Sequence, residues 1–252
     1  MKTFTHEDIL SANKEYYDKV AEDYRQNEGY AYSEGIIDDV TKIIKHYSGL
    51  LEEKRRFLDF GCGSGFLSEV VFENKIFEYG TGIDVSWAQI DLYNRKFNNE
   101  KFKALVGDVM NFPHGDSTFD MAGCYSVLHH ILDYKAVINE VTRVLKSGGI
   151  LYVDFEPNRR FRKLMSLPLS IRRRIFDKAP QNLDHLEYVA EYHHNIEQGI
   201  DKDAFLDWLN ADYSILDVGP RYPKSLSTPV LKCLSNLSWS FSPYFYVVAR
   251  KK

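Results

Sequence analysis

A glycine-rich turn between an apolar run and a helix-like segment limits the fold of this chain more than any other feature. The turn reads GCGSG and covers residues 61–65, and the run RFLDF at 56–60 precedes it. Residues 66–72 follow with apolar side chains at helical spacing. Glycines allow a ligand to approach the backbone closely, and a helix start offers unpaired N–H groups. The segment therefore predicts a strand, a ligand-binding turn and a helix.

Strand-like and helix-like segments continue to alternate after this turn. Strands are expected at residues 79–85, 102–106, 119–125 and 150–155, and helices at 86–97, 134–145 and 201–209. Such alternation favours a doubly wound α/β fold, a parallel sheet with helices on both faces. The last two strand-like runs, 213–218 and 244–249, have no helical pattern between them and are expected to pair antiparallel.

The length and composition are consistent with one such domain. A chain of 252 residues with 44% hydrophobic and 27% charged residues can bury a sizeable core and cover it. We expect one domain over 1–252, with a helical arm at 1–50 and a core at 55–155. A cap insertion at 156–200 and a C-terminal helix and strands at 201–252 complete it. The cap insertion interrupts the alternation, and its residues 156–198 are expected to cover a ligand together with the arm at 7–24.

Charge and cysteine content exclude several classes of protein. The net charge of -4 argues against a grip on nucleic acid by the whole protein. Residues 159–174 nevertheless hold seven basic residues and no acid, interleaved with apolar ones. This stretch is either a cap helix with solvated arginines, a pocket for an anionic or lipid-like substrate, or a peripheral membrane contact through 159–176.

The three cysteines form no CxxC pair and no zinc-like cluster, which predicts a reduced, cytoplasmic protein without a structural metal. No apolar run is long enough to span a membrane, and the N-terminus does not have the pattern of a signal peptide. Cys124 is expected to be a buried strand residue.

An acidic residue lies at or just after the end of each of the first three predicted strands. Asp59 precedes the glycine turn and suits an ammonium or sulfonium group, while Phe66 replaces the third glycine that a dinucleotide fingerprint needs. Asp84 ends the second strand, where it can accept two ribose hydroxyls or serve only as a helix cap. Asp108 and the apolar Val109 suit an adenine amino group and ring. Together they predict one crevice for a nucleoside-shaped ligand.

Five segments resemble the successive motifs of class I S-adenosylmethionine-dependent methyltransferases, in their small-molecule branch (methyltransferase type 11, similar to ubiquinone-biosynthesis enzymes). The segments are LDFGCGSG, GIDVS, GDVMNFPHGDSTFD, CYSVLHHI and VLKSGGILYV, within roughly residues 55–155. The resemblance implies a Rossmann-like sheet of seven mostly parallel strands with the last one antiparallel. It also implies S-adenosylmethionine as the cofactor. The positions that would contact this cofactor are Asp59, Gly61, Cys62, Gly63, Gly65, Asp84, Val85, Asp108, Val109, Tyr125, Tyr17 and Tyr24.

Aromatic and histidine side chains are candidates for the chemistry. Tyr17, Tyr24 and Tyr125 offer ring faces that can hold a sulfonium cation. His130 and His129 follow the fourth strand, where a neutral imidazole can take a proton from a hydroxyl or amine, or serve local packing only.

The expected function is in-line methyl transfer from S-adenosylmethionine to a small organic molecule, with the acceptor atom left open. The fourth strand ends without the Asn/Asp-Pro-Pro-Tyr motif of enzymes that methylate base amines. The alternatives are an RNA or protein methyltransferase that uses the basic insertion, and a non-catalytic cofactor-binding protein.

Overall fold

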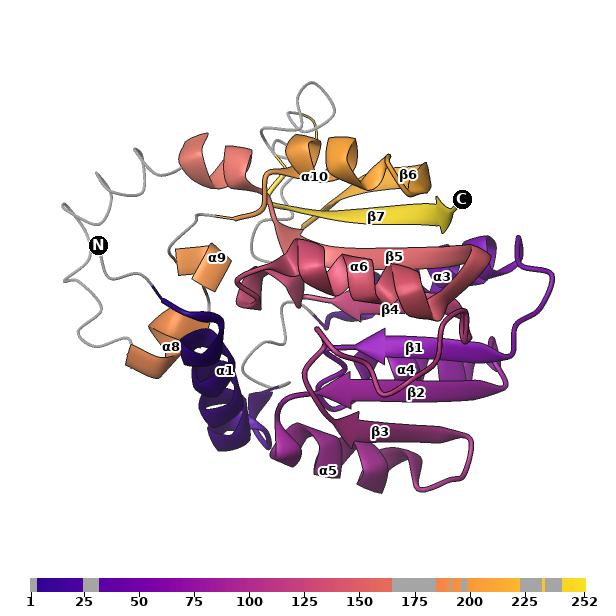
Figure 1. Ribbon diagram of the computed structural model, residues 1–252, viewed down its shortest axis with the longest axis horizontal. Coiled ribbons are helices and arrows are strands. Elements are labelled where there is room, and N and C mark those ends of the chain that lie inside the picture. Colours follow the sequence, from indigo (N-terminus) through magenta and orange to yellow (C-terminus); the bar gives the residue numbers. More distant parts are fainter. Residues whose placement is uncertain are drawn as a thin grey trace.

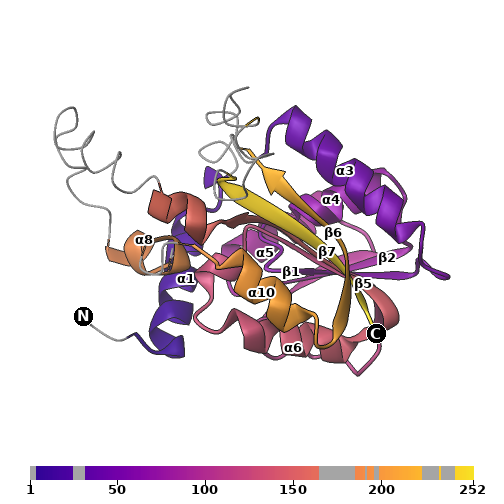
Figure 2. The ribbon, with the colours of Figure 1, turned by 90° about the horizontal axis from the view of Figure 1, so that it is seen from above.

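The computed structural model describes residues 4–24, 32–164, 185–190, 192–195, 199–222, 233 and 242–252. Its framework is a seven-stranded sheet with helices on both faces (Figures 1 and 2). The strands are β1 (Arg56–Phe60), β2 (Tyr79–Asp84), β3 (Phe102–Val106), β4 (Phe119–Tyr125), β5 (Leu145–Pro157), β6 (Tyr213–Arg221) and β7 (Tyr244–Lys251). The helices are α1 (His6–Val20), α3 (Glu34–Ser48), α4 (Phe66–Glu73), α5 (Trp87–Phe97), the 3₁₀ turn η1 (Leu128–His130), α6 (Tyr134–Val144), α8 (His185–Ala190), α9 (Tyr192–Asn195) and α10 (Lys202–Leu209).

The strand order β3-β2-β1-β4-β5-β7-β6 confirms the predicted doubly wound fold. Strand β1 pairs in parallel with β2 on one side and with β4 on the other. The chain thus changes direction across the sheet at β1, and in sheets of this kind a ligand crevice forms beyond the carboxyl ends of the strands at that point. Strand β7 runs antiparallel between β5 and β6, which confirms the expected antiparallel last strand.

The two faces of the sheet carry separate apolar clusters. Helices α3, α4 and α5 contribute to one cluster, and α6 and α10 contribute to the other, so the sheet is the middle of three layers (Figure 2). Every residue of β4 is buried. A strand covered on both faces needs such a nearly continuous apolar sequence, and FDMAGCY provides it.

The last three strands are longer than their sequences predicted. Strand β5 begins directly after α6, at Leu145, and not after the glycine pair at Gly148 and Gly149. Leu145 pairs with Phe119 of β4, and a register shift follows before Met121 pairs with Ile150. The neighbouring strand therefore extends the pairing through residues whose own sequence is typical of a helix stop.

Helix α1 lies beyond the tips of β1, β2 and β3, whose arrowheads point toward it in Figure 1. It starts with a capping box in which Thr5 and Asp8 each bond to the other's backbone N–H. Ile9 and Ala12 of α1 form a small cluster with Val189 of α8. The arm and the described part of the predicted cap thus pack against each other above the sheet edge.

Much of the predicted cap and of the basic stretch lies outside the described residues, namely 165–184. In the part that is described, Arg160 forms an ion pair with Asp203, and the Arg159 guanidinium donates to the carbonyl oxygen of Gly199. These two arginines therefore have partners within the chain. Within the described ranges, no helix combines the length and the apolar character needed to cross a membrane.

Candidate functional site

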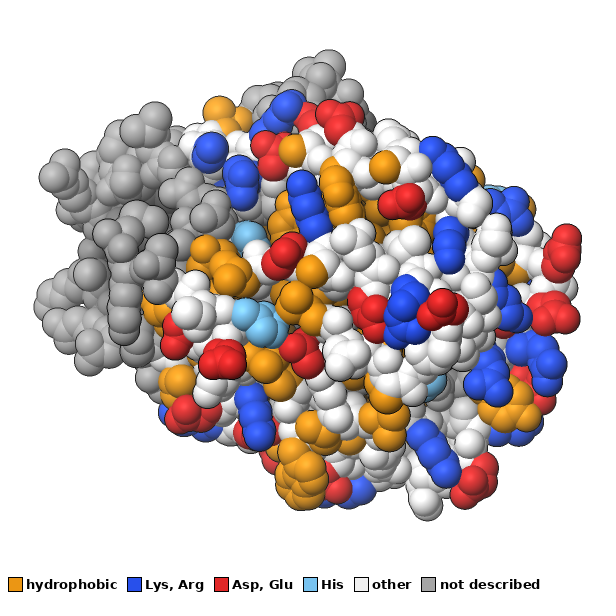
Figure 3. Space-filling view, viewed as in Figure 1, with side chains coloured by type: hydrophobic (Ala, Val, Ile, Leu, Met, Phe, Trp, Pro, Cys, Tyr) orange, Lys and Arg blue, Asp and Glu red, His pale blue; other side chains and the backbone are white. Residues whose placement is uncertain are grey.

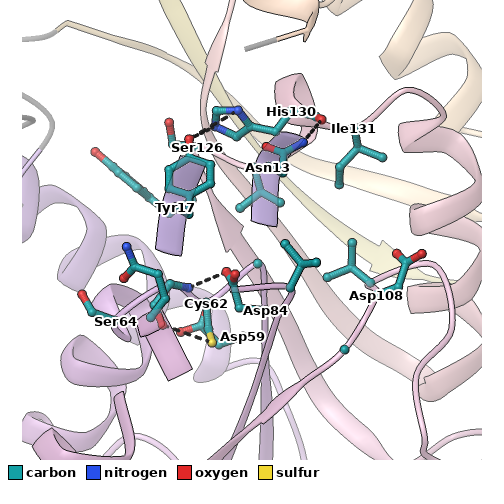
Figure 4. Close-up of a pocket in the computed structure, with 18 of the residues that line it drawn as sticks. Asn13, Tyr17, Asp59, Cys62, Ser64, Asp84, Asp108, Ser126, His130 and Ile131 are labelled. Carbon is teal, nitrogen blue, oxygen red and sulfur yellow. Dashed lines mark hydrogen bonds between the residues drawn. The ribbon is translucent and has the colours of Figure 1, made fainter. Parts of the chain in front are cut away.

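A pocket opens at the carboxyl edge of the sheet, between α1, the glycine turn and the ends of β2, β3 and β4 (Figure 4). Its empty volume, including its mouth, is about 1010 Å³. The predicted site residues that line it are Tyr17, Tyr24, Asp59, Gly61, Cys62, Gly63, Asp84, Val85, Asp108, Val109, Tyr125 and His130.

The glycine turn needs its glycines for backbone conformation and for space. Gly61 has a φ of +66°, and a Cβ there would lie 2.5 Å from Cγ1 of Val127. Gly65 has a φ of +87°, and a Cβ there would lie 2.7 Å from the rings of Tyr93 and Phe97. Such conformations are costly for other residues. Gly65 packs against these rings and is not in the pocket lining, so it shapes the turn, and its contact with the cofactor stays a prediction.

Asp84 joins the glycine turn to the start of α5. Its Oδ2 accepts from the backbone N–H of Gly63 at 2.8 Å, and its Oδ1 accepts from that of Ser86 at 2.9 Å. The N-cap of α5 is Ser86, whose hydroxyl accepts from the N–H of Gln89. Asp84 is therefore not the helix cap that the sequence left as its alternative role. A carboxylate offers about four acceptor positions. Asp84 therefore keeps capacity for further donors, and burial raises its pKa.

Asp59 is 2% exposed and holds the first turn of α4. Its Oδ2 accepts from both the N–H and the hydroxyl of Ser68, at 2.9 and 2.7 Å. Burial raises the pKa of Asp59 to about 7, against the opposing effect of the Ser68 bonds, and the charge of Asp84 raises it further. A cationic ligand group beside Asp59 would favour its ionised form.

Asp108 binds a side chain from the N-terminal arm. Its Oδ1 accepts from the N–H of Met110, and its Oδ2 lies 2.9 Å from Nε2 of His6. His6 is the first residue of α1 and also lines the pocket. The arm therefore reaches the end of β3.

Aromatic rings form a continuous wall on one side of the pocket. Ring centroids are 5.3 Å apart for Tyr17 and Tyr24, 6.5 Å for Tyr24 and Tyr32, and 5.8 Å for Tyr32 and Tyr125. Phe66 packs against Tyr125 at 4.6 Å. Three of these rings were predicted from the sequence, whereas Tyr32, which precedes α3, was not.

His130 faces the pocket in a defined tautomer. Its Nδ1 lies 3.0 Å from the carbonyl oxygen of Ala190, which can only accept, so Nδ1 carries a proton. In the neutral ring Nε2 is then an acceptor, and the Tyr17 hydroxyl lies 3.1 Å from it. The Ala190 carbonyl ends α8, and thus the described part of the cap contacts this histidine directly.

His129, the second candidate base, is not among the residues that line the pocket. Its Nδ1 lies 2.8 Å from Glu156, and both side chains are buried. The Glu156 carboxylate also accepts from the backbone N–H groups of Val127, Leu128 and His129. His129 and Glu156 therefore fix the turn that presents His130.

Several lining residues were missed by the sequence analysis. His6 and Asn13 lie on α1 eleven and four residues before Tyr17, a spacing that puts all three on one helical face. That spacing was the available signal. Gln89 also lines the pocket, and its Oε1 is buried without a hydrogen-bond partner among the described residues.

Residues 58–153 match a known protein family, described as Methyltransferase domain. An uncharacterised methyltransferase of Schizosaccharomyces pombe is 32% identical over 126 residues, which cover 46% of this chain and 43% of that protein. The 27-O-demethylrifamycin SV methyltransferase of Amycolatopsis mediterranei is 31% identical over 122 residues, 44% of this chain and 43% of that enzyme. The match thus spans less than half the length of these curated relatives.

Solved structures share the fold over nearly the whole chain. The [4+2]-cyclase SpnF superimposes with a TM-score of 0.62 at 19% identity, covering 95% of this chain and 96% of its own. The geranyl diphosphate C-methyltransferase of Streptomyces coelicolor A3(2), solved with S-adenosyl-L-homocysteine, has a TM-score of 0.55 at 14% identity and covers 84% of this chain and 79% of its own. Strand order, motif positions and sequence matches agree, and residues 58–153 carry a methyltransferase domain of the class I S-adenosylmethionine-dependent type.

Proposed function

We propose that this protein transfers the methyl group of S-adenosylmethionine to a small organic molecule bound in the same pocket. The observation that carries the proposal is one cavity that brings the strand-end acids Asp84 and Asp108 together with an acceptor nitrogen of His130. Relatives with this domain include a 27-O-demethylrifamycin SV methyltransferase and a fatty-acid O-methyltransferase, which are named for small-molecule substrates.

The pocket lining fits the cofactor of this family. Asp84 would hold the ribose hydroxyls, and Asp108 with Val109 would meet the adenine. The unpaired Oε1 of Gln89 supports a ligand that brings a hydrogen-bond donor into the pocket, because a buried carbonyl oxygen without a partner is unfavourable. Asp59 and the tyrosine rings suit a ligand with an ammonium and a sulfonium group. When bound, S-adenosylmethionine supplies a methyl group activated for displacement.

The chain's own residues then have to orient the acceptor, exclude water and take a proton. Nε2 of His130 would take that proton, directly or through the Tyr17 hydroxyl bonded to it. Helix α1 and the residues around α8 would close the pocket, as the cover predicted from 156–198 and the arm at 7–24. Alignment of the reacting atoms in a closed site supplies most of the rate in reactions of this kind.

Two other functions remain candidates. The basic stretch would serve an RNA or protein methyltransferase. The second candidate is a protein that binds the cofactor without transferring its methyl group. The fold leaves this open, because a [4+2]-cyclase shares it and a fold by itself does not set the reaction. On the face shown in Figure 3, acidic and basic side chains are interspersed over the described residues. Such a surface gives no specific support to binding of a polyanion.

Methyl-labelled S-adenosylmethionine distinguishes the three functions. The protein is incubated with it and with an extract separated into small-molecule, RNA and protein fractions. We expect label in the small-molecule fraction, and we expect His130→Ala to reduce the rate by about 100-fold or more while S-adenosylhomocysteine still binds. Label in RNA or protein would support the first alternative, and binding without any transfer would support the second.

A further inference from the structure

Asn13, in the third turn of α1, has an amide group whose orientation is fixed by its surroundings. Its Nδ2 donates to the carbonyl oxygen of Ile9 at 2.9 Å and to that of His130 at 3.0 Å. Both partners can only accept, so the amide nitrogen must face them. If the amide were turned over, Oδ1 would face the carbonyl oxygens of Ile9 and His130, which is unfavourable. Oδ1 therefore points away from these two carbonyls.

The Oδ1 atom of Asn13 is buried and has no hydrogen-bond partner among the described residues. The residue is 7% exposed and lines the pocket. In Figure 4, Asn13 lies beside Tyr17 and His130, across the pocket from Asp84 and Cys62. Buried carbonyl oxygens are satisfied in nearly all folded proteins, so an exception that lines a pocket indicates a donor supplied by a ligand.

The surroundings of this oxygen define what the ligand must look like. Apolar residues next to Asn13 and His130 in the chain also line the pocket: Ile9 and Leu10 on α1, and Ile131 and Leu132 after η1. The other polar groups beside Asn13 are Nε2 of His130, an acceptor in the neutral ring, and the Tyr17 hydroxyl 3.1 Å from that nitrogen. The described lining contains no Lys or Arg that could pair with a carboxylate or phosphate.

We propose that Asn13 determines substrate specificity by accepting, at Oδ1, a hydrogen bond from an N–H or O–H group of the methyl acceptor. The acceptor is then an amine or hydroxyl compound with an apolar body, and this inference rests on the proposed function. An amide oxygen is too weak a base to take the proton, so Asn13 orients the group that His130 deprotonates.

The test uses three aromatic probes of nearly equal shape: 4-ethylphenol, 4-ethylaniline and 4-ethyltoluene. Their dissociation constants are measured by ligand-observed NMR on the full chain saturated with S-adenosylhomocysteine. We expect a donor probe to bind at least about tenfold more tightly than 4-ethyltoluene, because bound 4-ethyltoluene leaves Oδ1 unpaired in a site closed to water. In Asn13→Leu this preference should disappear, whereas Asn13→Asp, which keeps an acceptor oxygen, should retain it for 4-ethylaniline.

Leu10→Ala is the matched control, because it removes an apolar contact in the same region and should weaken all three probes alike. The inference is overturned if the wild-type protein does not prefer the donor probes to 4-ethyltoluene, and this includes the case in which none of the three binds. The same holds for a preference that persists in Asn13→Leu. Calorimetry with S-adenosylhomocysteine comes first, and its failure would count against the proposed function, whereas cofactor binding without donor preference counts only against the role of Asn13.

Discussion

Two aspartates of the pocket have the same side chain and different tasks. Asp59 gives Oδ2 to Ser68 and so fixes the start of α4. Asp84 connects Gly63 to Ser86 by one oxygen each and so sets the distance between the glycine turn and α5. Both are buried, and the pKa of each is raised for that reason. The two aspartates therefore differ in the elements that they hold, and each is tested by its own substitution.

Asp84→Ala should weaken the binding of S-adenosylhomocysteine about tenfold or more, because two ribose hydroxyls and two backbone N–H groups lose their acceptor, at about 1–3 kcal/mol. Isothermal titration calorimetry measures the change. Asp91→Ala is the matched control, since Asp91 lies on α5 and forms an ion pair with Arg95 at the surface. Equal affinity in Asp84→Ala and the wild-type protein would place the ribose elsewhere.

Asp59 should make stability depend on pH. Its folded pKa of about 7 lies above the value of about 4 for an unfolded aspartate. Between these values the folded state alone binds the proton, so the free energy of unfolding falls as pH rises from about 4 to 7. Asp59→Asn keeps an acceptor for Ser68 and removes the charge. Its stability relative to wild type should rise by on the order of 1–2 kcal/mol between pH 5 and pH 8 in urea titrations. A difference independent of pH would contradict the raised pKa.

At the scale of elements, α1 lines the pocket and is held by specific polar contacts. The carboxylate of Asp18 accepts from the hydroxyl of Ser86 and from the N–H of Ala88, both at the start of α5. The His6 contact to Asp108 and the Asn13 contact to the His130 carbonyl attach the same helix to β3 and to η1. Polar side chains of α1 therefore contact three segments that follow strands of the sheet: the start of α5 after β2, the end of β3, and η1 after β4.

Asp18→Ala should loosen α1, because the helix loses its link to the start of α5. We expect faster amide exchange over α1 in the free protein, and weaker binding of S-adenosylhomocysteine by a factor of about 3–10, for the loss of one to two hydrogen bonds. Hydrogen exchange with mass spectrometry measures the first effect. Glu15→Ala, at an exposed position of the same helix, should change neither. Unchanged exchange in Asp18→Ala would show that apolar packing on α8 suffices to hold α1.

At the scale of the whole molecule, the pocket is lined by the arm, by the glycine turn and by the residues that follow β2, β3 and β4. A ligand that fills it must therefore stabilise the entire fold and not one element. S-adenosylhomocysteine at about 100 times its dissociation constant should raise the free energy of unfolding by about 2.7 kcal/mol. For a chain of this size the melting temperature should rise by roughly 5–11 °C. Thermal scans with NAD should show no rise, and a rise with NAD alone would overturn the choice of cofactor.

The sequence by itself determined the framework and the acid positions. Strand and helix periodicities, the glycine turn and the acids after successive strands are local patterns, and the doubly wound topology follows from them because few connections between alternating elements are allowed. Asp59, Asp84 and Asp108 could be placed at one edge because parallel strands end together. The extent of β5 could not, because its first residues are ordered by pairing with β4.

Only the tertiary structure decided which side chains share the pocket. His130 and His129 are neighbours with the same chemistry, and Glu156, 27 residues after His129, draws one of them away from the cavity. The arm brings His6, Asn13 and Tyr17 into contact with Asp108 and His130, which lie more than 100 residues away in the chain. A pattern along the chain shows which face of a helix is special. What that face meets depends on packing between distant segments, and this arises only when the whole chain folds.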